Sequence, residues 1–267
     1  MTLFHLTLLA LLQGVTEFLP VSSSGHLILL PQLTGLRDQG LMLDVAVHVG
    51  TLAAVVIYLW RDVADAAGGA GRLVRGRVDT PGARLALSLA VATVPVVLLG
   101  LVLKLTGAMD ALRSLAVIGW TMIGFGIVLY WHDRRGASAS TISDWSVRDA
   151  IRLGLWQAVA LIPGTSRSGA TITGARALGY TRHDAARISM LMSIPTIVAS
   201  GALLGGEALA QADAQALRDG VIAMMLAFVA ALLALTLMMR LLRSVSFTPY
   251  VVYRIGLGGI LLAVTYG

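Results

Sequence analysis

The sequence contains no cysteine and little charge. Without cysteine, a disulfide framework, an iron–sulfur cluster and a cysteine nucleophile are excluded. Only 13% of the 267 residues are charged, against about 25% in soluble domains. Hydrophobic residues make up 57%, and the mean hydropathy is +0.83. We therefore expect a polytopic membrane protein.

Basic residues outnumber acidic ones, 20 to 14, but they are scattered between apolar stretches. A dispersed set of this kind does not indicate a nucleic-acid partner. Arginine instead gathers on alternate connections, above all in the 61–83 loop. Because basic residues concentrate on the cytoplasmic side of membrane proteins, we place that loop in the cytoplasm.

Six stretches are long and apolar enough to span a membrane, which requires roughly 20 residues. They cover about residues 42–60, 84–104, 113–131, 184–203, 219–241 and 249–266. Two further apolar segments, 3–33 and 147–179, are interrupted near their centres by Pro, Gly and Ser. We expect an all-α membrane domain of residues 1–267.

The two interrupted segments align without a gap at an offset of 144, with QGVTEFLPVSSSGH (13–26) over QAVALIPGTSRSGA (157–170). The same offset carries residues 1–123 onto 145–267, so we predict a duplication with halves of about 1–135 and 145–267. Three spans in each half would invert the second half relative to the first, as in many transporters. The interrupted segments are then re-entrant helical hairpins, whose non-helical turns must be buried or line a wet cavity.

Ionisable residues in these hairpins are the first functional candidates, because charge at membrane depth is costly. Glu17 and His26 lie in the first hairpin and Arg167 in the second. Gln13 and Glu17, four residues apart, share a helix face and could offer oxygen ligands to a divalent cation. The simpler alternative is that Glu17 pairs with Arg167 only to hold the hairpins together.

The turns SSSGH (22–26) and GTSRSGAT (164–171) combine hydroxyls, glycines and exposed backbone N–H groups. Such turns can form an anion-binding nest, and the planar guanidinium of Arg167 suits phosphate oxygens. The alternative is that small residues merely let helices pack closely. We predict that phosphate contacts Ser22, Ser24, Gly25, Gly164, Thr165, Ser166, Ser168 and Gly169.

Two other residues are weaker candidates. His48 follows Asp44 by four residues near the outer end of a span, where a role in the pocket wall and a structural hydrogen bond are equally good interpretations. For Arg254, inside the last span, a structural contact is the preferred interpretation and a contact with phosphate is the alternative.

The blocks QGVTEFLPVSSSGHL and PGTSRSGATITGA and the late PYVVYRIG resemble the bacterial undecaprenyl-diphosphate phosphatase family, also called UppP or BacA. The resemblance covers essentially the whole chain. It implies a multi-pass protein of the bacterial inner (cytoplasmic) membrane that removes one phosphate from undecaprenyl diphosphate, a polyprenyl lipid. The product carries peptidoglycan precursors, and the activity confers bacitracin resistance.

The resemblance also implies roles for single residues. The family's [E/Q]xxxE motif falls on Gln13 and Glu17, its essential serine and histidine on Ser23 and His26, and its arginine on Arg167. From the spacing of Gln13 and Glu17 we expect a divalent cation, Mg²⁺ or Ca²⁺, held by Glu17 and Gln13. The nucleophile stays open among Ser23, His26 and water, and a homodimer is one alternative for the assembly. A carrier of lipid phosphate across the bilayer, or an ion-coupled transporter, is the rival function.

Overall fold

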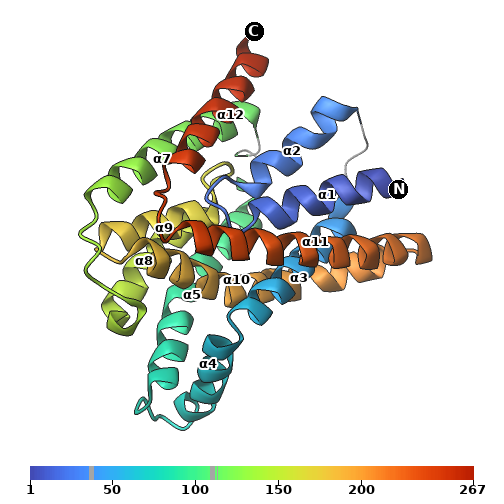
Figure 1. Cartoon of the computed structure of the whole chain (residues 1–267). Coiled ribbons are helices and arrows are strands. Elements are labelled where there is room, and N and C mark those ends of the chain that lie inside the picture. The colour runs from blue at the N-terminus through green and yellow to red at the C-terminus, as the bar shows by residue number, and fades with distance from the viewer. Residues whose placement is uncertain (36–38, 109–111, 113) are drawn as a thin grey trace.

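The structure, a computed structural model, describes residues 1–35, 39–108, 112 and 114–267, without the side chains of residues 31–34 and 211. The described residues form helices and no strand (Figure 1). The helices long and apolar enough to cross a membrane number six among the described residues and match the predicted spans. They are α3 (Gly40–Tyr58), α5 (Pro81–Thr106), α7 (Leu115–Arg135), α10 (Arg182–Gln211), α11 (Ala214–Leu241) and α12 (Thr248–Tyr266). Residue 113, where the third predicted span begins, lies outside the described residues.

Each interrupted segment folds as two short helices joined by a turn. The first consists of α1 (Leu3–Thr16) and α2 (Ser23–Thr34), and the second of α8 (Val147–Val159) and α9 (Arg167–Ala177). Pro20 lies in the first turn, and Pro163 and Gly164 lie in the second. Helix α1 ends at Thr16 and α8 at Val159, a few residues before these prolines, which cannot continue a helix. The helical hairpins are present, and their re-entry into a membrane stays a prediction.

One helix was not predicted. Within the basic 61–83 loop, α4 (Trp60–Leu73) packs against α5. Arg187 of α10 pairs with Asp62 of α4 through two hydrogen bonds of 2.9 and 2.5 Å. A short 3-10 helix, η1 (Ile142–Asp144), lies between α7 and α8.

Helix positions refine the proposed duplication. The first three helices of each half start at 3, 23 and 40 against 147, 167 and 182, which gives offsets of 144, 144 and 142. The last two start at 81 and 115 against 214 and 248, an offset of 133 for both. The offset of 144 therefore holds for the two hairpins and is 142 at α3 and α10. It is wrong for the last two helices, because α4 lengthens the first half's connection.

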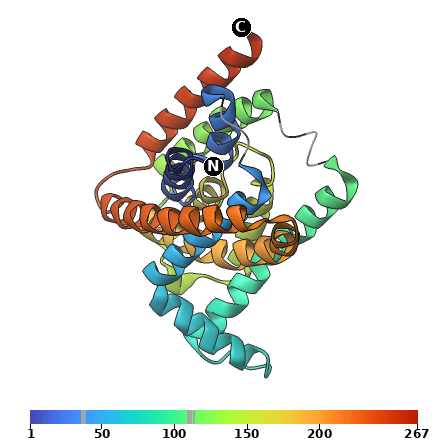
Figure 2. The same cartoon turned by 90° about the vertical axis from the view of Figure 1, so that its right-hand side faces the viewer.

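Helices of each half pack against helices of the other half. Helix α1 packs on α11, and its counterpart α8 packs on α5, the counterpart of α11. In the same way α3 packs on α11, and α10 packs on α5, while α7 and α12 pack on each other. Figure 2 shows α1 end-on beside α11. Such reciprocal contacts are what two halves related by a two-fold axis would make, and the inversion across a membrane stays a prediction.

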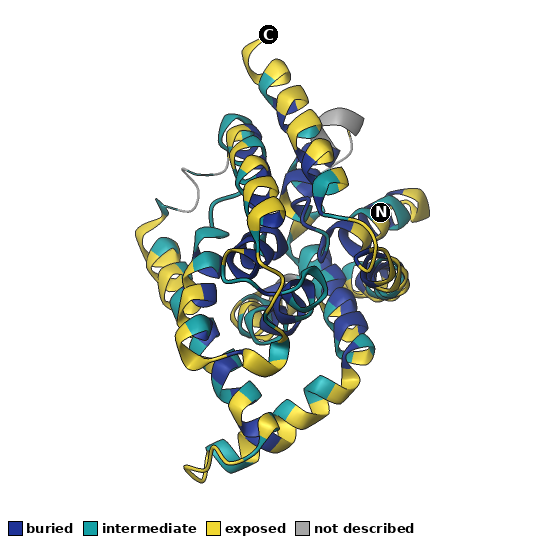
Figure 3. Cartoon of the chain, turned by 60° about the vertical axis from the view of Figure 1, so that its left-hand side comes forward, coloured by how far each residue is buried: buried dark blue, intermediate teal, exposed yellow. Residues whose placement is uncertain are grey.

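The long helices bury one face and expose apolar side chains on the other (Figure 3). Exposed large residues include Leu98 on α5, Trp120 on α7 and Leu233 on α11. Monomeric soluble proteins rarely expose contiguous apolar surface on this scale. The exterior therefore suits lipid, and the polar chemistry is gathered where the two hairpin turns meet.

Candidate phosphate site between the two hairpins

The two hairpin turns touch each other. The Ser168 hydroxyl donates to the backbone carbonyl of Leu19 at 2.8 Å. Fully buried Arg254 of α12 donates to the carbonyls of Pro20 (3.4 Å), Gly164 (3.1 Å) and Thr165 (2.8 Å), so one guanidinium ties both turns together. This supports the structural interpretation of Arg254.

Both turns contain a serine with a left-handed backbone. Ser22 has a φ of 72° and Ser166 a φ of 70°, and the two positions are 144 apart. Each hydroxyl also contacts that of the serine two residues later, Ser24 at 3.2 Å and Ser168 at 3.1 Å. Left-handed non-glycine residues are uncommon and cluster at functional sites. The two turns therefore share the same local backbone conformation and the same pair of serine hydroxyls, as the predicted duplication would require.

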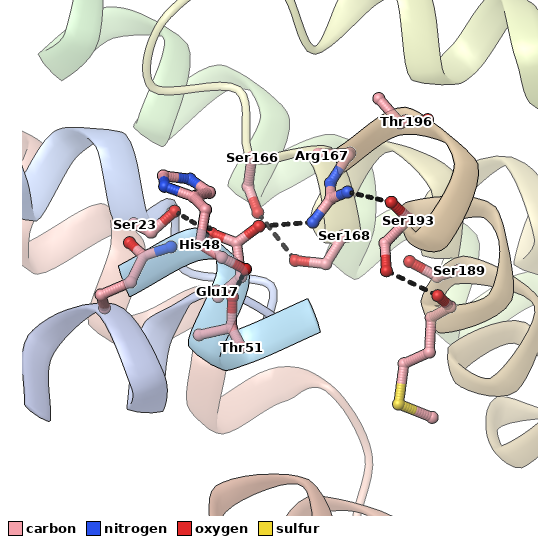
Figure 4. A network of polar contacts seen from close by, with 12 residues as sticks. Glu17, Ser23, His48, Thr51, Ser166, Arg167, Ser168, Ser189, Ser193 and Thr196 are labelled. Carbon is pink, nitrogen blue, oxygen red and sulfur yellow. Dashed lines mark hydrogen bonds and ion pairs between the residues drawn. The ribbon is translucent and has the colours of Figure 1, made fainter. Parts of the chain in front are cut away.

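Glu17 is the centre of the contacts between the hairpins (Figure 4). One carboxylate oxygen, Oε1, accepts from Nη2 of Arg167. The other, Oε2, accepts from the Ser23 hydroxyl at 2.8 Å and from Nε2 of Gln13 at 2.9 Å. The Glu17 side chain is 6% exposed and that of Arg167 17%. The acid and the arginine predicted to converge are thus in direct contact.

Arg167 begins α9 and reaches across the gap between the hairpins. Its Nη1 donates to the backbone carbonyl of Ser193 on α10 at 3.2 Å. A guanidinium has five N–H donors in a planar fork, and the described contacts use two. The side chain lines the cavity described below, so the rest of its fork can meet an anion there.

His48 on α3 joins this cluster. Its Nδ1 lies 2.7 Å from the backbone carbonyl oxygen of Asp44. That oxygen can only accept, so Nδ1 carries the hydrogen. Nε2 faces the Glu17 carboxylate at 3.8 Å, and the side chain is 38% exposed and lines the cavity. Both interpretations of His48 hold, since one ring nitrogen makes a structural bond and the other meets the site.

His26 is oriented differently. Its Nδ1 donates to the Ser22 carbonyl at 2.7 Å, and its Nε2 accepts from the Tyr253 hydroxyl of α12 at 2.6 Å. The two rings are stacked with an interplanar angle of 1°. His26 is buried and is not among the described residues that line the cavity. The structure therefore brings Glu17, Ser23 and Arg167 together and places His26 behind them.

A cavity of about 1170 Å³ opens from this cluster. Its polar end includes Glu17, Ser23, His48 and Arg167. Its other walls are mostly apolar and come from α3, α10 and α11, with Met42, Ile197, Leu204, Val221 and Met224 among them. The space therefore has a charged inner end and an apolar body.

The predicted phosphate-binding residues divide into two groups. Ser22, Ser24 and Ser166 line the cavity. Gly25, Gly164, Thr165, Ser168 and Gly169 are not among its described lining residues and instead shape the turns. A Cβ on Gly164 would come within 2.2 Å of the Thr121 hydroxyl, and one on Gly169 within 2.6 Å of Arg254. Their contact with phosphate stays a prediction.

Thr196 on α10 also lines the cavity but was not a sequence candidate. It lies in an apolar span, directly after Pro195, in a region without ionisable residues. The sequence carries no signal that would single it out.

A metal site built from protein alone is not evident. Within the described residues, no group of three or more His, Asp or Glu side chains is arranged to hold an ion. Gln13 is fully buried and does not line the cavity, although its Oε1 is without a hydrogen-bond partner. Mg²⁺ is commonly held by one or two carboxylates together with substrate phosphates. The donor set would therefore fit a cation that Glu17 holds together with phosphate oxygens of a ligand.

These features define a class of protein. A multi-pass membrane protein with a guanidinium, hydroxyls and a carboxylate at the inner end of an apolar cavity is built to handle an anionic lipid. The cavity's two ends match the two ends of such a molecule.

Comparison with known proteins identifies the family. The model of the family described as bacitracin resistance protein BacA matches residues 6–260. Three relatives are each named undecaprenyl-diphosphatase: those of Ruegeria pomeroyi (70% identical) and Dinoroseobacter shibae (68%), matched over 100% of both chains, and that of Maricaulis maris (47%), over 98% of both. The chain belongs to the BacA family.

Proposed function

We propose that this protein hydrolyses undecaprenyl diphosphate to undecaprenyl phosphate and inorganic phosphate. The reaction recycles the lipid that carries peptidoglycan precursors, and an abundant enzyme would confer bacitracin resistance. Membership of the BacA family and the names of relatives at 65–70% identity support the activity.

The observation that carries the proposal is the Glu17–Arg167 contact at the polar end of the apolar cavity. A diphosphate needs positive charge and hydroxyl donors, whereas its polyprenyl chain needs an apolar surface. The cavity supplies both in one continuous space. A soluble phosphate ester would need only the first.

Charge stabilisation is the main task of such a site. Cleaving a phosphoanhydride requires positioning and neutralisation of the phosphoryl oxygens more than covalent chemistry by the protein. Arg167 would bind the terminal phosphate bidentately with the N–H groups that its contacts to Glu17 and Ser193 do not use. Glu17 holds the guanidinium in position and keeps the Ser23 hydroxyl at the cavity wall.

The attacking group is one of three. In the structure Ser23 donates to Glu17, so the carboxylate is the base that Ser23 contacts. His26 would have to give up its bond to Tyr253 before Nε2 could attack phosphorus or accept a proton. Water is the third nucleophile. Trapping a phosphoenzyme and locating its label decides among them, and a label that survives His26→Ala eliminates the histidine as nucleophile.

A divalent cation, Mg²⁺ or Ca²⁺, completes the proposed site. Glu17 would hold it together with diphosphate oxygens, while Gln13 could contribute only after its amide turns toward the cavity. When bound, the ion neutralises part of the diphosphate charge. The Glu17 carboxylate would then contact both the ion and the Arg167 guanidinium.

We place the protein in the bacterial cytoplasmic membrane, with the 61–83 loop and α4 on the cytoplasmic side. The exposed apolar faces of the six long helices and the distribution of arginine support this location. A homodimer remains an alternative for the assembly, which sedimentation in detergent would test.

The rival function is transport of the lipid phosphate, which the comparisons do not support. Purified protein in detergent, given undecaprenyl diphosphate and Mg²⁺, should release inorganic phosphate. Detergent micelles have no two sides, so a carrier would release none. An inactive wild type in this assay, with Arg167→Ala protein as the matched blank, would refute the proposed function.

A further inference from the structure

One face of α10 forms a long wall of the cavity. Two adjacent rows of residues, each with a spacing of four, line it: Thr196, Ser200, Leu204 and Ala208, and beside them Ile197, Gly201, Gly205 and Leu209. Residues at this spacing lie on one helix face. From Thr196 to Leu209 the wall extends about 20 Å at 1.5 Å per residue.

Glycine leaves this wall without side chains in its middle. A Cβ built on Gly201 or on Gly205 would meet no atom within 4 Å. Other helix glycines permit close packing; at Gly14, for instance, a Cβ would lie 2.6 Å from Ala230. Gly201 and Gly205 therefore enlarge the cavity and do not serve helix packing.

The cavity opens through apolar edges. Val49 of α3, Val198 and Leu209 of α10 and Val221 of α11 line it and are also exposed, by 40, 53, 62 and 56%. These residues lie on helices that are candidate membrane spans or at their ends. A chain that enters from the bilayer would meet mostly apolar surface on its way to the phosphate site, with the hydroxyls of Thr196 and Ser200 among the wall residues of α10.

We propose that Gly201 and Gly205 determine specificity for the lipid chain, by forming the channel wall on which the first isoprene units of the polyprenyl diphosphate lie. The inference rests on the proposed function, because the occupant is the lipid whose diphosphate binds at Glu17 and Arg167. The continuity of the apolar wall with that site identifies the occupant. The head group fixes one end of the lipid, so the units next to it must pass along α10.

Leucine at these positions tests the proposal. Gly201→Leu and Gly205→Leu would each put a side chain into the channel, since a Cβ at either position would meet no atom within 4 Å. Gly206→Leu is the matched control: Gly206 neighbours Gly205, its Cβ would also meet nothing within 4 Å, and it does not line the cavity. All three changes replace a helix-interior glycine by a strong helix former, so their effect on folding is shared.

The assay compares a long and a short substrate, undecaprenyl diphosphate and geranyl diphosphate, in one detergent. Gly205→Leu should raise KM for the long substrate at least about tenfold, since about two carbon groups lose their burial. It should leave kcat/KM for geranyl diphosphate nearly unchanged, because that short chain ends before Gly205. Gly201→Leu, nearer the phosphate site, should impair both substrates. Gly206→Leu should match the wild type with both.

Two outcomes would overturn the inference. One is equal behaviour of Gly205→Leu and Gly206→Leu, and the other is an equal loss by Gly205→Leu on long and short substrates. Binding of the product, undecaprenyl phosphate, to the same proteins is measured in parallel. Weaker binding by Gly205→Leu than by Gly206→Leu would support the channel even if no protein releases phosphate. An inactive wild type thus counts against the proposed function alone, and equal binding by all variants counts against the channel alone.

Discussion

The Glu17–Arg167 pair offers a test that separates a structural role from a functional one. The pair joins the two hairpins, and both side chains are largely buried, at 6 and 17% exposure. Removing one partner of a buried ion pair strands the other charge and typically costs about 3–5 kcal/mol, whereas replacing both can be nearly neutral. Glu17→Gln and Arg167→Gln should each destabilise the protein on this scale.

Arg167 has a partial substitute for its lost partner, because it also donates to the Ser193 carbonyl at 3.2 Å. Glu17 likewise keeps donors from Ser23 and Gln13. These remaining bonds place both single variants at the lower end, about 3 kcal/mol. In the double variant two neutral amides can bond to each other, so we expect at least half of the summed loss to be recovered.

Turnover should respond differently from stability. Each single variant should release phosphate at least about a hundredfold more slowly, the scale for losing a charge-stabilising group. The double variant should regain stability, measured by thermal unfolding in detergent, but no activity. If the pair served only to hold the hairpins together, the double variant would recover both. A double variant with near wild-type phosphate release would therefore refute the catalytic assignment.

Four further outcomes are expected. Gly164→Ala should lower stability by more than about 1 kcal/mol, because Gly164 has a φ of 86° and the added Cβ would come 2.2 Å from Thr121. An unchanged unfolding temperature would contradict this packing. Arg254→Met should lower the free energy of unfolding by about 3–6 kcal/mol, because it loses the two shorter charged hydrogen bonds of Arg254. It should also slow turnover by misaligning the turns. A fully active, equally stable variant would show that the turns align without Arg254. His26→Ala should reduce phosphate release at least about a hundredfold. Tyr253→Phe removes one neutral hydrogen bond and should reduce it by no more than about fivefold. Equal losses in the two variants would mean that His26 serves only to hold Tyr253. Chelation of divalent cations should abolish phosphate release, with recovery on adding Mg²⁺ or Ca²⁺, and turnover that persists in excess chelator would remove the cation from the site.

Much of the architecture follows from the sequence alone. Apolar run length is a local property, so each of the six long helices overlaps its predicted span. The hairpin breaks at Pro20 and at Pro163–Gly164 were predictable for the same reason, since proline and glycine act on their own backbone. The contact between Glu17 and Arg167 followed from a repeat argument, because two duplicated turns with buried charge had to meet. Helix α4 was missed because it is too short and too polar to match the pattern of a membrane span.

Other features depended on how helices cross. The sequence presented His26 and His48 as two histidines near the site, but only the packing of α3 and α12 decided that His48 faces Glu17 and that His26 turns to Tyr253. The direction of a side chain is set by its helix's rotation against neighbours far along the chain. The channel wall of α10 likewise exists because α3 and α11 leave Gly201 and Gly205 uncovered. A glycine reads the same in sequence whether its missing side chain admits a helix or a lipid, and only the tertiary structure separates the two.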